Sequence, residues 1–203
     1  MHKEVLYEKQ LEILRILKIF WKDFYLAWWT AIALQLWHRK SIDFDFFSNK
    51  KINNSKIIKK LQENNFLIDY ILVDNKTEEL TLIVNWVKIT FLYYPFEIVC
   101  SEKFEWIKLP NLEYLWAMKF YTIWRRAKWK DYVDVYKILK EKNNFVEISK
   151  LAEKIFWWAY NEKLFREQIC YYDDIDYSEE VEFLGEKIEK NEIENFLKKI
   201  SVS

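Results

Sequence analysis

The chain has 203 residues, of which 51% are hydrophobic and 19% aromatic, so we expect one domain, or two small ones, with a well-packed interior. Its 32 basic and 32 acidic residues give a formal net charge of +0, which excludes a generally basic nucleic-acid coat and an acidic solvating tail. Two cysteines are too few for a disulfide framework, and no apolar run reaches the roughly 18 residues that a membrane span needs. We therefore expect a cytoplasmic protein with free thiols and no membrane segment.

The spacing of apolar residues predicts the order of helices and strands along the chain. Helices are expected over 4–20, 30–36, 53–64, 112–124, 131–141, 146–156, 161–170 and 179–200, and strands over 24–27, 41–47, 66–73, 79–84 and 87–93. This order predicts an α+β fold, with a mixed sheet and helices in residues 1–104 and a helical region in residues 105–203.

The composition departs from that of ordinary proteins in two residue types. The chain holds 1 glycine and 11 tryptophans, whereas at average usage a chain of this length holds roughly 14 glycines. A fold with a single glycine has almost no residue suited to positions where φ must be positive. We therefore compared the tryptophan positions with the places where a fold needs glycine.

Several tryptophans occupy positions typical of glycine. Asn85-Trp86 joins two predicted strands, where a two-residue type I′ hairpin turn favours Asn-Gly. Trp37 follows a predicted helix at the place of a left-handed C′ glycine, and Trp28-Trp29 and Trp157-Trp158 are adjacent pairs, as Gly-Gly often is. Some bacterial lineages read the codon UGA as glycine where other translation tables read tryptophan. Our hypothesis is that most or all of these tryptophans are glycine in the native organism; the alternative is a protein truly rich in tryptophan.

The predicted strand over 41–47 carries the pattern most suggestive of chemistry. Its alternation places Asp43 and Asp45 on the same side, with Cα atoms about 6–7 Å apart. Two carboxylates held in this way can bind divalent metal ions that neutralise a triphosphate and activate an attacking oxygen. If positions 28 and 29 are glycine, the preceding turn lets backbone N–H groups approach phosphate at a helix N-terminus. The alternative is a surface strand with two solvated aspartates.

With glycine at the tryptophan positions, residues 26–48 read LAGGTAIALQLGHRKSIDFDFFS. This segment resembles the glycine-turn and D-x-D signature of the DNA polymerase β-like nucleotidyltransferase superfamily. It is more closely similar to the AbiEii/AbiGii toxin family, whose members often read GGT…L..HR.S.D.DFF. A second block, Ala117-Met118-Lys119 followed by Arg125-Arg126 and the segment 130–136 (KDYVDVY), is similar to the family's MK…R…KD..DLY region. The resemblance covers about residues 20–140.

The resemblance implies a fold, an activity and a set of site residues. It implies a polymerase β-like nucleotidyltransferase core, with a helical C-terminal region that completes the active site. The implied residues are Asp43 and Asp45 as ligands of two Mg²⁺ ions, Lys119 at the triphosphate of the NTP substrate, Asp131 as a further catalytic acid, and Trp28, Trp29, Thr30, Arg39, Ser41, Arg125 and Arg126 around the nucleotide. Trp28 and Trp29 replace the family's glycines, and two indoles there would fill the phosphate-binding turn.

The five basic residues between Lys119 and Lys130, with no acidic residue among them, form a local positive patch suited to a triphosphate or an RNA end. The alternative for this patch is a solvated helix face. The resemblance implies an RNA acceptor such as the 3′ end of tRNA, and a cognate antitoxin as protein partner. Two other functions remain open: transfer of a nucleotide to a small molecule of the aminoglycoside type, and a degenerate, non-catalytic fold that acts as an interaction protein.

Overall fold

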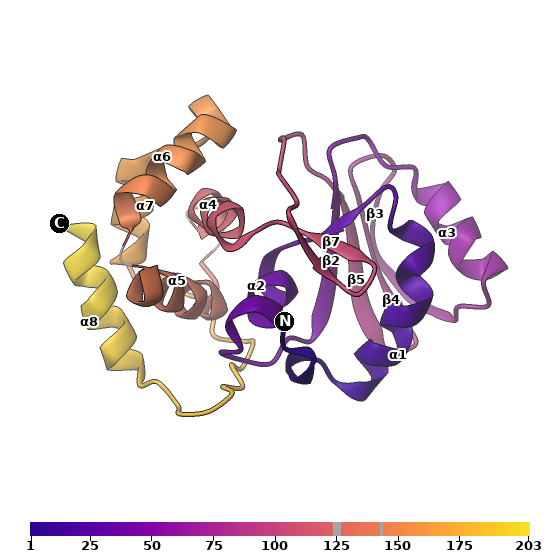
Figure 1. Cartoon of the computed structure of the whole chain (residues 1–203), viewed down its shortest axis with the longest axis horizontal. Coiled ribbons are helices and arrows are strands. Elements are labelled where there is room, and N and C mark those ends of the chain that lie inside the picture. The colour runs from indigo at the N-terminus through magenta and orange to yellow at the C-terminus, as the bar shows by residue number, and fades with distance from the viewer. Residues whose placement is uncertain (124–126, 143) are drawn as a thin grey trace. The chain divides into compact units, whose positions relative to one another are not determined.

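The computed structural model describes residues 1–123, 127–142 and 144–203. They form two compact units, an N-terminal unit, Met1–Asn111, and a C-terminal unit, Leu112–Ser203, each of which is described by itself. The N-terminal unit is built on a sheet and the C-terminal unit is helical (Figure 1). The predicted α+β class is therefore confirmed. No helix of the described residues has the length and apolar composition of a membrane span.

A five-stranded sheet forms the centre of the N-terminal unit. The elements of this unit are η1 (Lys3–Val5), α1 (Glu8–Ile16), η2 (Leu17–Phe20), β1 (Tyr25–Leu26), α2 (Trp28–Leu36), β2 (Asp43–Ser48), α3 (Asn54–Glu63), β3 (Ile68–Asn75), β4 (Glu79–Val84), β5 (Val87–Tyr93), β6 (Glu102–Phe104) and β7 (Ile107–Leu109). The strand order is β1-β2-β5-β4-β3, in which β2 and β5 are parallel and every other neighbouring pair is antiparallel. The strand β2 is thus an interior strand of a mixed sheet.

Aromatic side chains pack on both faces of β2. On one face, Phe46 stacks on Phe91 of β5 with ring centroids 5.6 Å apart, and Phe20 of η2 lies 4.9 Å from Phe91. On the other face, Phe47 contacts Tyr25 and the indole of Trp28 at the start of α2. All six residues of β2 are buried. The two faces differ, because Phe44 and Phe46 lie on one and Asp43 and Asp45 on the other. A slip of one residue would move the aspartates to the face of Phe44 and Phe46, so the register is firmly specified.

Helices alone make up the regular structure of the described C-terminal unit. They are α4 (Leu112–Ile123), α5 (Trp129–Lys142), α6 (Phe145–Phe156), η3 (Trp157–Ala159), α7 (Glu162–Ile169) and α8 (Lys190–Ser201). Phe120 of α4 stacks on Phe165 of α7 at 4.0 Å, and Tyr121 stacks on Phe156 of α6 at 4.3 Å. These contacts explain why α4 is buried around most of its circumference.

Three predicted segments differ from the structure. The helix expected over 4–20 is divided, because Tyr7 is extended and caps α1 while residues 17–20 form a 3₁₀ turn. The hairpin of β6 and β7 was not predicted, since strands of three residues give almost no periodic signal. The helix expected over 179–200 is wrong before Lys190. Residues 173–189 are irregular, and Asp176 exchanges backbone hydrogen bonds with Ala127 and Trp129.

Four tryptophans have a backbone conformation that favours glycine. The φ angles are 48° at Trp28, 51° at Trp37, 66° at Trp86 and 48° at Trp157. Trp37 is the left-handed residue that ends α2, and Asn85-Trp86 forms the two-residue turn between paired Val84 and Val87. The predicted left-handed helix end and hairpin turn are confirmed. Residues with a Cβ avoid this region at a cost of about 1–2 kcal/mol each.

The surroundings of other indoles also differ from those of tryptophans in ordinary proteins. Tryptophan is buried on average, yet Trp157 is 75% exposed and Trp158 is 91% exposed. In α4 the buried Nε1 of Trp116 has no hydrogen-bond partner among the described residues. An unsatisfied buried donor of this kind costs roughly 1–3 kcal/mol. The exposed indoles of Trp157 and Trp158 therefore contribute little packing, whereas Trp116 is buried with its donor unsatisfied.

The neighbouring pair Trp157 and Trp158 provides a direct test of this strain. Trp157 has φ 48° and ψ −124°, whereas Trp158 is not among the positive-φ residues. We expect Trp157→Gly to raise the free energy of unfolding by about 1 kcal/mol, because glycine relieves the backbone strain. Trp158→Gly, the matched control, should leave that free energy unchanged or lower it. Urea unfolding measures the free energy of unfolding of both variants. A loss of stability in Trp157→Gly would contradict backbone strain at this residue.

Candidate active site

Asp43 and Asp45 lie on the same side of β2, and both are only 5% exposed. Their register partners on β5 are Lys88 and Thr90. The alternative of a solvated surface strand is therefore wrong, because two carboxylates are held within the body of the unit. Burial of a carboxylate is costly unless a cation or hydrogen bonds compensate it. Paired buried carboxylates are thus a feature that stability alone does not explain.

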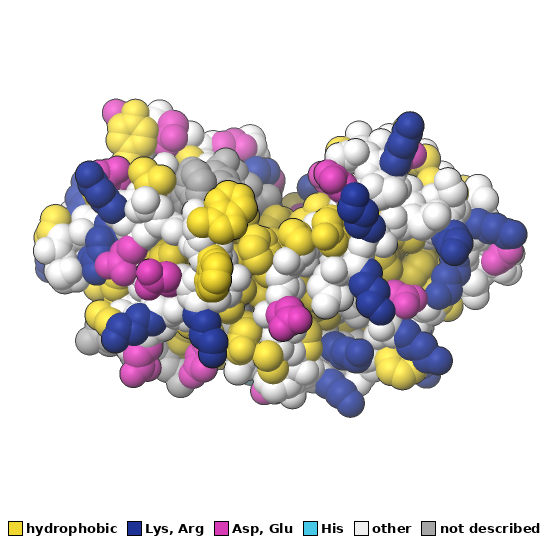
Figure 2. All heavy atoms as spheres, turned by 90° about the horizontal axis from the view of Figure 1, so that it is seen from above, with side chains coloured by type: hydrophobic (Ala, Val, Ile, Leu, Met, Phe, Trp, Pro, Cys, Tyr) yellow, Lys and Arg dark blue, Asp and Glu magenta, His cyan; other side chains and the backbone are white. Residues whose placement is uncertain are grey.

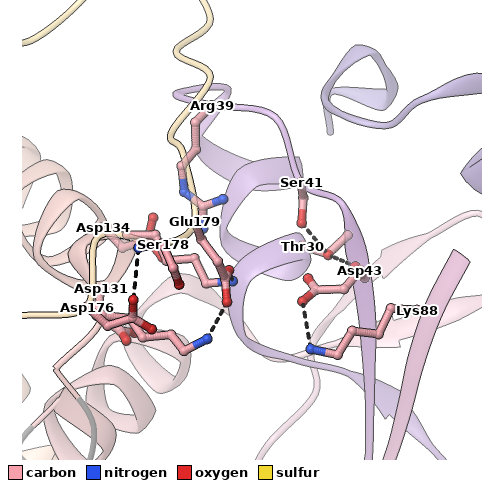
Figure 3. Close-up of polar contacts among 12 residues, drawn as sticks. Thr30, Arg39, Ser41, Asp43, Lys88, Asp131, Asp134, Asp176, Ser178 and Glu179 are labelled. Carbon is pink, nitrogen blue, oxygen red and sulfur yellow. Dashed lines mark hydrogen bonds and ion pairs between the residues drawn. The ribbon is translucent and has the colours of Figure 1, made fainter. Parts of the chain in front are cut away.

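Hydrogen bonds tie the start of α2 to the same residues of β2. The backbone N–H of Ala27, the N-cap of α2, donates to the carbonyl of Asp45 at 2.9 Å. The hydroxyl of Thr30 donates to the carbonyl of Asp43, so the Ser41 hydroxyl is the donor to Thr30 Oγ1, over 2.7 Å. Figure 3 shows Asp43 with Thr30 and Ser41 on one side and Lys88 on the other. The helix N-terminus and the two carboxylates are therefore fixed together.

The turn that leads into α2 is filled by two indoles. Trp28 packs edge-on against Phe47 with ring centroids 4.7 Å apart. Trp29 is buried, and the guanidinium of Arg39 lies 5.2 Å from the centre of its ring. Arg39 is itself buried and donates to the carbonyl of Lys40 at 2.9 Å. At a helix N-terminus the backbone N–H groups can bind phosphate, and a side chain at position 28 occupies space beside them.

Lys88 is a site residue that the sequence did not indicate. Its Nζ lies 4.0 Å from Oδ2 of Asp43, and its side chain is 45% exposed. The pairing depends on the parallel register of β2 and β5, which join segments more than 40 residues apart. Long-range strand pairing cannot be derived from the local pattern around Lys88. The alternation of apolar and polar residues in the predicted strand over 87–93 was the only signal available.

The donor set on β2 fits a magnesium ion better than a structural transition metal. Mg²⁺ is commonly held by one or two carboxylates, with substrate phosphates and waters completing its coordination. Asp43 and Asp45 supply such a pair. Within residues 1–123, 127–142 and 144–203 there is no group of three or more His, Cys, Asp or Glu side chains arranged to hold a metal. The set therefore suits a metal that arrives with a phosphorylated substrate.

In the C-terminal unit, Lys119 of α4 pairs with two aspartates of α5. Its Nζ lies 2.8 Å from Oδ1 of Asp131 and 3.3 Å from Oδ2 of Asp134, and all three side chains are fully buried. The two aspartates are three residues apart and so share a helix face. This cluster joins α4 to α5 within the core of the unit. Contact of Lys119 with a triphosphate, and a catalytic role of Asp131, stay predictions.

Two lysines of the predicted basic patch, Lys128 and Lys130, form ion pairs with an acidic residue. Glu179, from the irregular segment 173–189, accepts hydrogen bonds from both Lys128 and Lys130. Burial acts to raise the pKa of Glu179, but these two cations outweigh it and lower the pKa to about 2. The solvated helix face is therefore wrong for Lys130, which is only 7% exposed. Arg125 and Arg126 lie outside the described residues.

The fold of the chain is similar to that of a solved structure with a nucleotidyltransferase description. A proposed nucleotidyltransferase from H. pylori aligns with a TM-score of 0.53 at 15% identity, over 97% of this chain and 94% of that chain. The Megavirus polyadenylate synthase aligns with a TM-score of 0.46 at 16% identity, over 66% of this chain and 31% of that chain. No protein-family model and no curated protein gives a match. The first likeness shows a nucleotidyltransferase-like α+β fold with a helical C-terminal part.

The lowered pKa of Glu179 predicts a pH-dependent contribution to stability. A carboxylate with a depressed folded-state pKa stabilises the fold above its ordinary value of 4.5, and this stabilisation is lost as pH falls toward about 2. At pH 7 we expect Glu179→Gln to lower the free energy of unfolding by about 1 kcal/mol, after allowance for solvent screening. The difference from the unsubstituted chain should shrink between pH 4.5 and pH 2.

Urea unfolding at pH 7, 4 and 2 measures this difference. The exposed neighbour Glu180 is the matched control, and Glu180→Gln should change stability little at any pH. An effect of Glu179→Gln that is the same at all three pH values would contradict an ionic contact with Lys128 and Lys130.

Proposed function

We propose that the protein is a metal-dependent nucleotidyltransferase that acts on an RNA acceptor. In the reaction, a hydroxyl oxygen of the acceptor forms a bond to the α-phosphorus of an NTP. The bond from that phosphorus to the oxygen bridging to the β-phosphate breaks, and pyrophosphate leaves with the electron pair. The hydroxyl proton passes to a base. The products are the nucleotidylated acceptor and pyrophosphate.

The observation that carries this proposal is the attachment of a helix N-terminus to two buried carboxylates. Ala27 and Thr30 bond to the carbonyls of Asp45 and Asp43, so the turn and the carboxylates keep one geometry. A triphosphate needs both parts, namely backbone N–H groups for its oxygens and carboxylates for the cation that accompanies it. The nucleotidyltransferase-like fold supports the same activity.

Asp43 and Asp45 are the residues that would hold Mg²⁺, with two ions expected. Bound there, the metal would neutralise charge on the phosphates and lower the pKa of the attacking hydroxyl. The chain itself orients these ligands, because Thr30 and Ser41 hold the backbone at Asp43. Preorganised donors of this kind need no rearrangement when the transition state forms.

Further residues are proposed around the nucleotide. The backbone N–H groups at positions 28 and 29 would contact phosphate oxygens, and Arg39 would add positive charge. The hydroxyls of Thr30 and Ser41, expected around the nucleotide, donate instead to the Asp43 carbonyl and to Thr30 Oγ1, so their proposed role is to position the turn. Lys119 would contact the triphosphate and Asp131 would act as the base, as the resemblance to the AbiEii/AbiGii family implies. Arg125 and Arg126 are proposed to bind the nucleotide on the same ground. The resemblance also supports tRNA as the acceptor and a toxin role controlled by an antitoxin.

We further propose that the tryptophans stand for glycine, through reassignment of UGA. Support comes from the positive φ angles of Trp28, Trp37, Trp86 and Trp157, and from the exposure of Trp158. One cause, a single codon read with the wrong table, accounts for both the excess of tryptophan and the lack of glycine. With glycine at position 28, the space now taken by an indole lies open to phosphate.

A second candidate function follows if the tryptophans are genuine. The indole of Trp28, packed on Phe47, would then obstruct the turn that a triphosphate needs. The chain would be a degenerate nucleotidyltransferase that acts by binding a protein partner. This candidate predicts no transfer to any acceptor.

Substitution of the β2 carboxylates tests the activity. In a chain with glycine at the 11 tryptophan positions, we expect Asp43→Asn and Asp45→Asn each to slow transfer of labelled NTP to total tRNA at least about 100-fold. The exposed Asp173→Asn is the control and should keep full activity. Label on an aminoglycoside but not on tRNA would show that the acceptor is a small molecule and not RNA. No transfer to either acceptor would favour the degenerate fold that acts as an interaction protein.

The genetic-code proposal has its own test. The gene should carry TGA rather than TGG at positions 28, 29 and 86. The protein isolated from its native organism should be lighter by the tryptophan–glycine mass difference times the number of reassigned positions, which is 11 if all are glycine. Intact-mass spectrometry of the native protein measures this. TGG codons at those positions, or a mass that matches the sequence as written, would refute the reassignment.

A further inference from the structure

A cavity of about 490 Å³ opens in the N-terminal unit, away from the two carboxylates. It lies between the turn after η2, the loop after β2 and the first turns of α3. Five lysines line it, together with Asp23, two asparagines and an apolar floor; the lysines are Lys22, Lys50, Lys51, Lys56 and Lys60. Its volume is within the range of ligand pockets and is much larger than a single small ion requires.

The frame of this cavity is fixed by hydrogen bonds. Asn54 at the start of α3 donates to Asp74 at 2.6 Å and to the carbonyl of Glu79 at 2.9 Å, and this anchors the helix to β3 and β4. The backbone N–H of Ile52 donates to Thr77. Lys60 Nζ donates to the carbonyl of Ile19 at 2.6 Å and so joins α3 to the turn on the opposite wall. The backbone frame of the cavity is therefore held in place, and Lys60 is fixed with it.

The charge of the lining is strongly one-sided. Five lysines face one aspartate, which is a local excess of 5 − 1 = 4 positive charges in a chain whose net charge is +0. Among the residues that the structure describes, none of the five lysines forms an ion pair with an acidic side chain. Figure 2 shows Lys and Arg side chains gathered on the visible face of this unit. The lining therefore favours binding of an anion.

The floor of the cavity is formed by four apolar side chains that are largely buried, Phe20, Phe24, Ile52 and Ile57, each exposed by 9% or less. The ammonium groups and amides of the lining match phosphate oxygens and ribose hydroxyls. Contacts to these groups do not read the base sequence.

The cavity lies at the C-terminal end of β2, and the two carboxylates lie in the first half of the strand. Ser48 at the end of the strand lines the cavity, whereas Asp43 begins the strand. Along extended chain, Asp43 and Asp45 are about 17 Å and about 10 Å from Ser48. A polynucleotide is long enough to reach both places.

We propose that the lysine-lined cavity binds the sugar-phosphate backbone of the RNA acceptor at a distance from the nucleotide addition site. The proposal rests on the proposed function for its choice of RNA. The lysines act as point charges along the RNA backbone. Binding of this kind is independent of the RNA sequence and dependent on the salt concentration.

A charge-removal variant tests the proposal with the full chain. Lys50, Lys51 and Lys56 are exposed and are replaced together by glutamine; the matched control replaces the exposed Lys9, Lys103 and Lys199. Affinity for fluorescein-labelled total tRNA is measured by anisotropy over a series of salt concentrations. We expect the cavity variant to bind about tenfold more weakly or worse, with a salt slope lower by about 2, and the control to bind as the unsubstituted chain does.

The outcomes separate this proposal from the enzymatic one. Lysine-dependent tRNA binding that survives Asp43→Asn, with or without transfer activity, supports the cavity as the RNA site. Equal loss in the two triple variants overturns it, as does transfer to tRNA with an unchanged KM for RNA in the cavity variant. Binding of inorganic triphosphate or of a poly-glutamate peptide through these lysines, without binding of tRNA, also overturns it.

Discussion

The short turn between β1 and α2 sets the constraint on which the candidate site depends. Here the chain must reverse from a strand into a helix while its backbone stays against β2. The N–H of Ala27 bonds to the carbonyl of Asp45, and the hydroxyl of Thr30 bonds to the carbonyl of Asp43, so the turn is tied to the backbone of both carboxylate-bearing residues. The turn requires a positive φ at residue 28, which glycine adopts without strain and which an indole-bearing residue does not. The proposed phosphate-binding role of the turn and its backbone geometry therefore both favour glycine at position 28.

The strain at residue 28 connects the site to the rest of the fold. Trp37 ends the same helix in the left-handed region, and Trp86 closes the hairpin that carries β5 alongside β2. Each of these positions determines the direction of the next element. A chain with glycine at these positions would build the same sheet at lower cost, because glycine adopts positive φ without strain.

Local pattern was sufficient to predict much of this architecture. Asn85-Trp86 and Trp37 indicated their turn and helix end, and the alternation in β2 placed Asp43 beside Asp45. The helix α3 was also predicted, since its signal lies within one stretch of chain, and the structure shows Asn53 as its cap. The features that escaped prediction depend on residues distant in sequence. Lys88 reaches Asp43 only through the register of two strands. Glu179 lies in a segment that was predicted to be helical but is irregular, and it binds lysines about 50 residues away. The lysine cavity joins three separate segments.

Nucleotide binding tests the central claim most directly. Isothermal titration calorimetry with an NTP and Mg²⁺ compares the chain as written with a variant that carries only Trp28→Gly and Trp29→Gly. Our account predicts that the glycine variant binds the nucleotide with measurable heat, that Asp45→Asn in the same background abolishes the binding, and that the chain as written does not bind. Equal affinity of the two chains, or no binding by a folded glycine variant, would contradict the account.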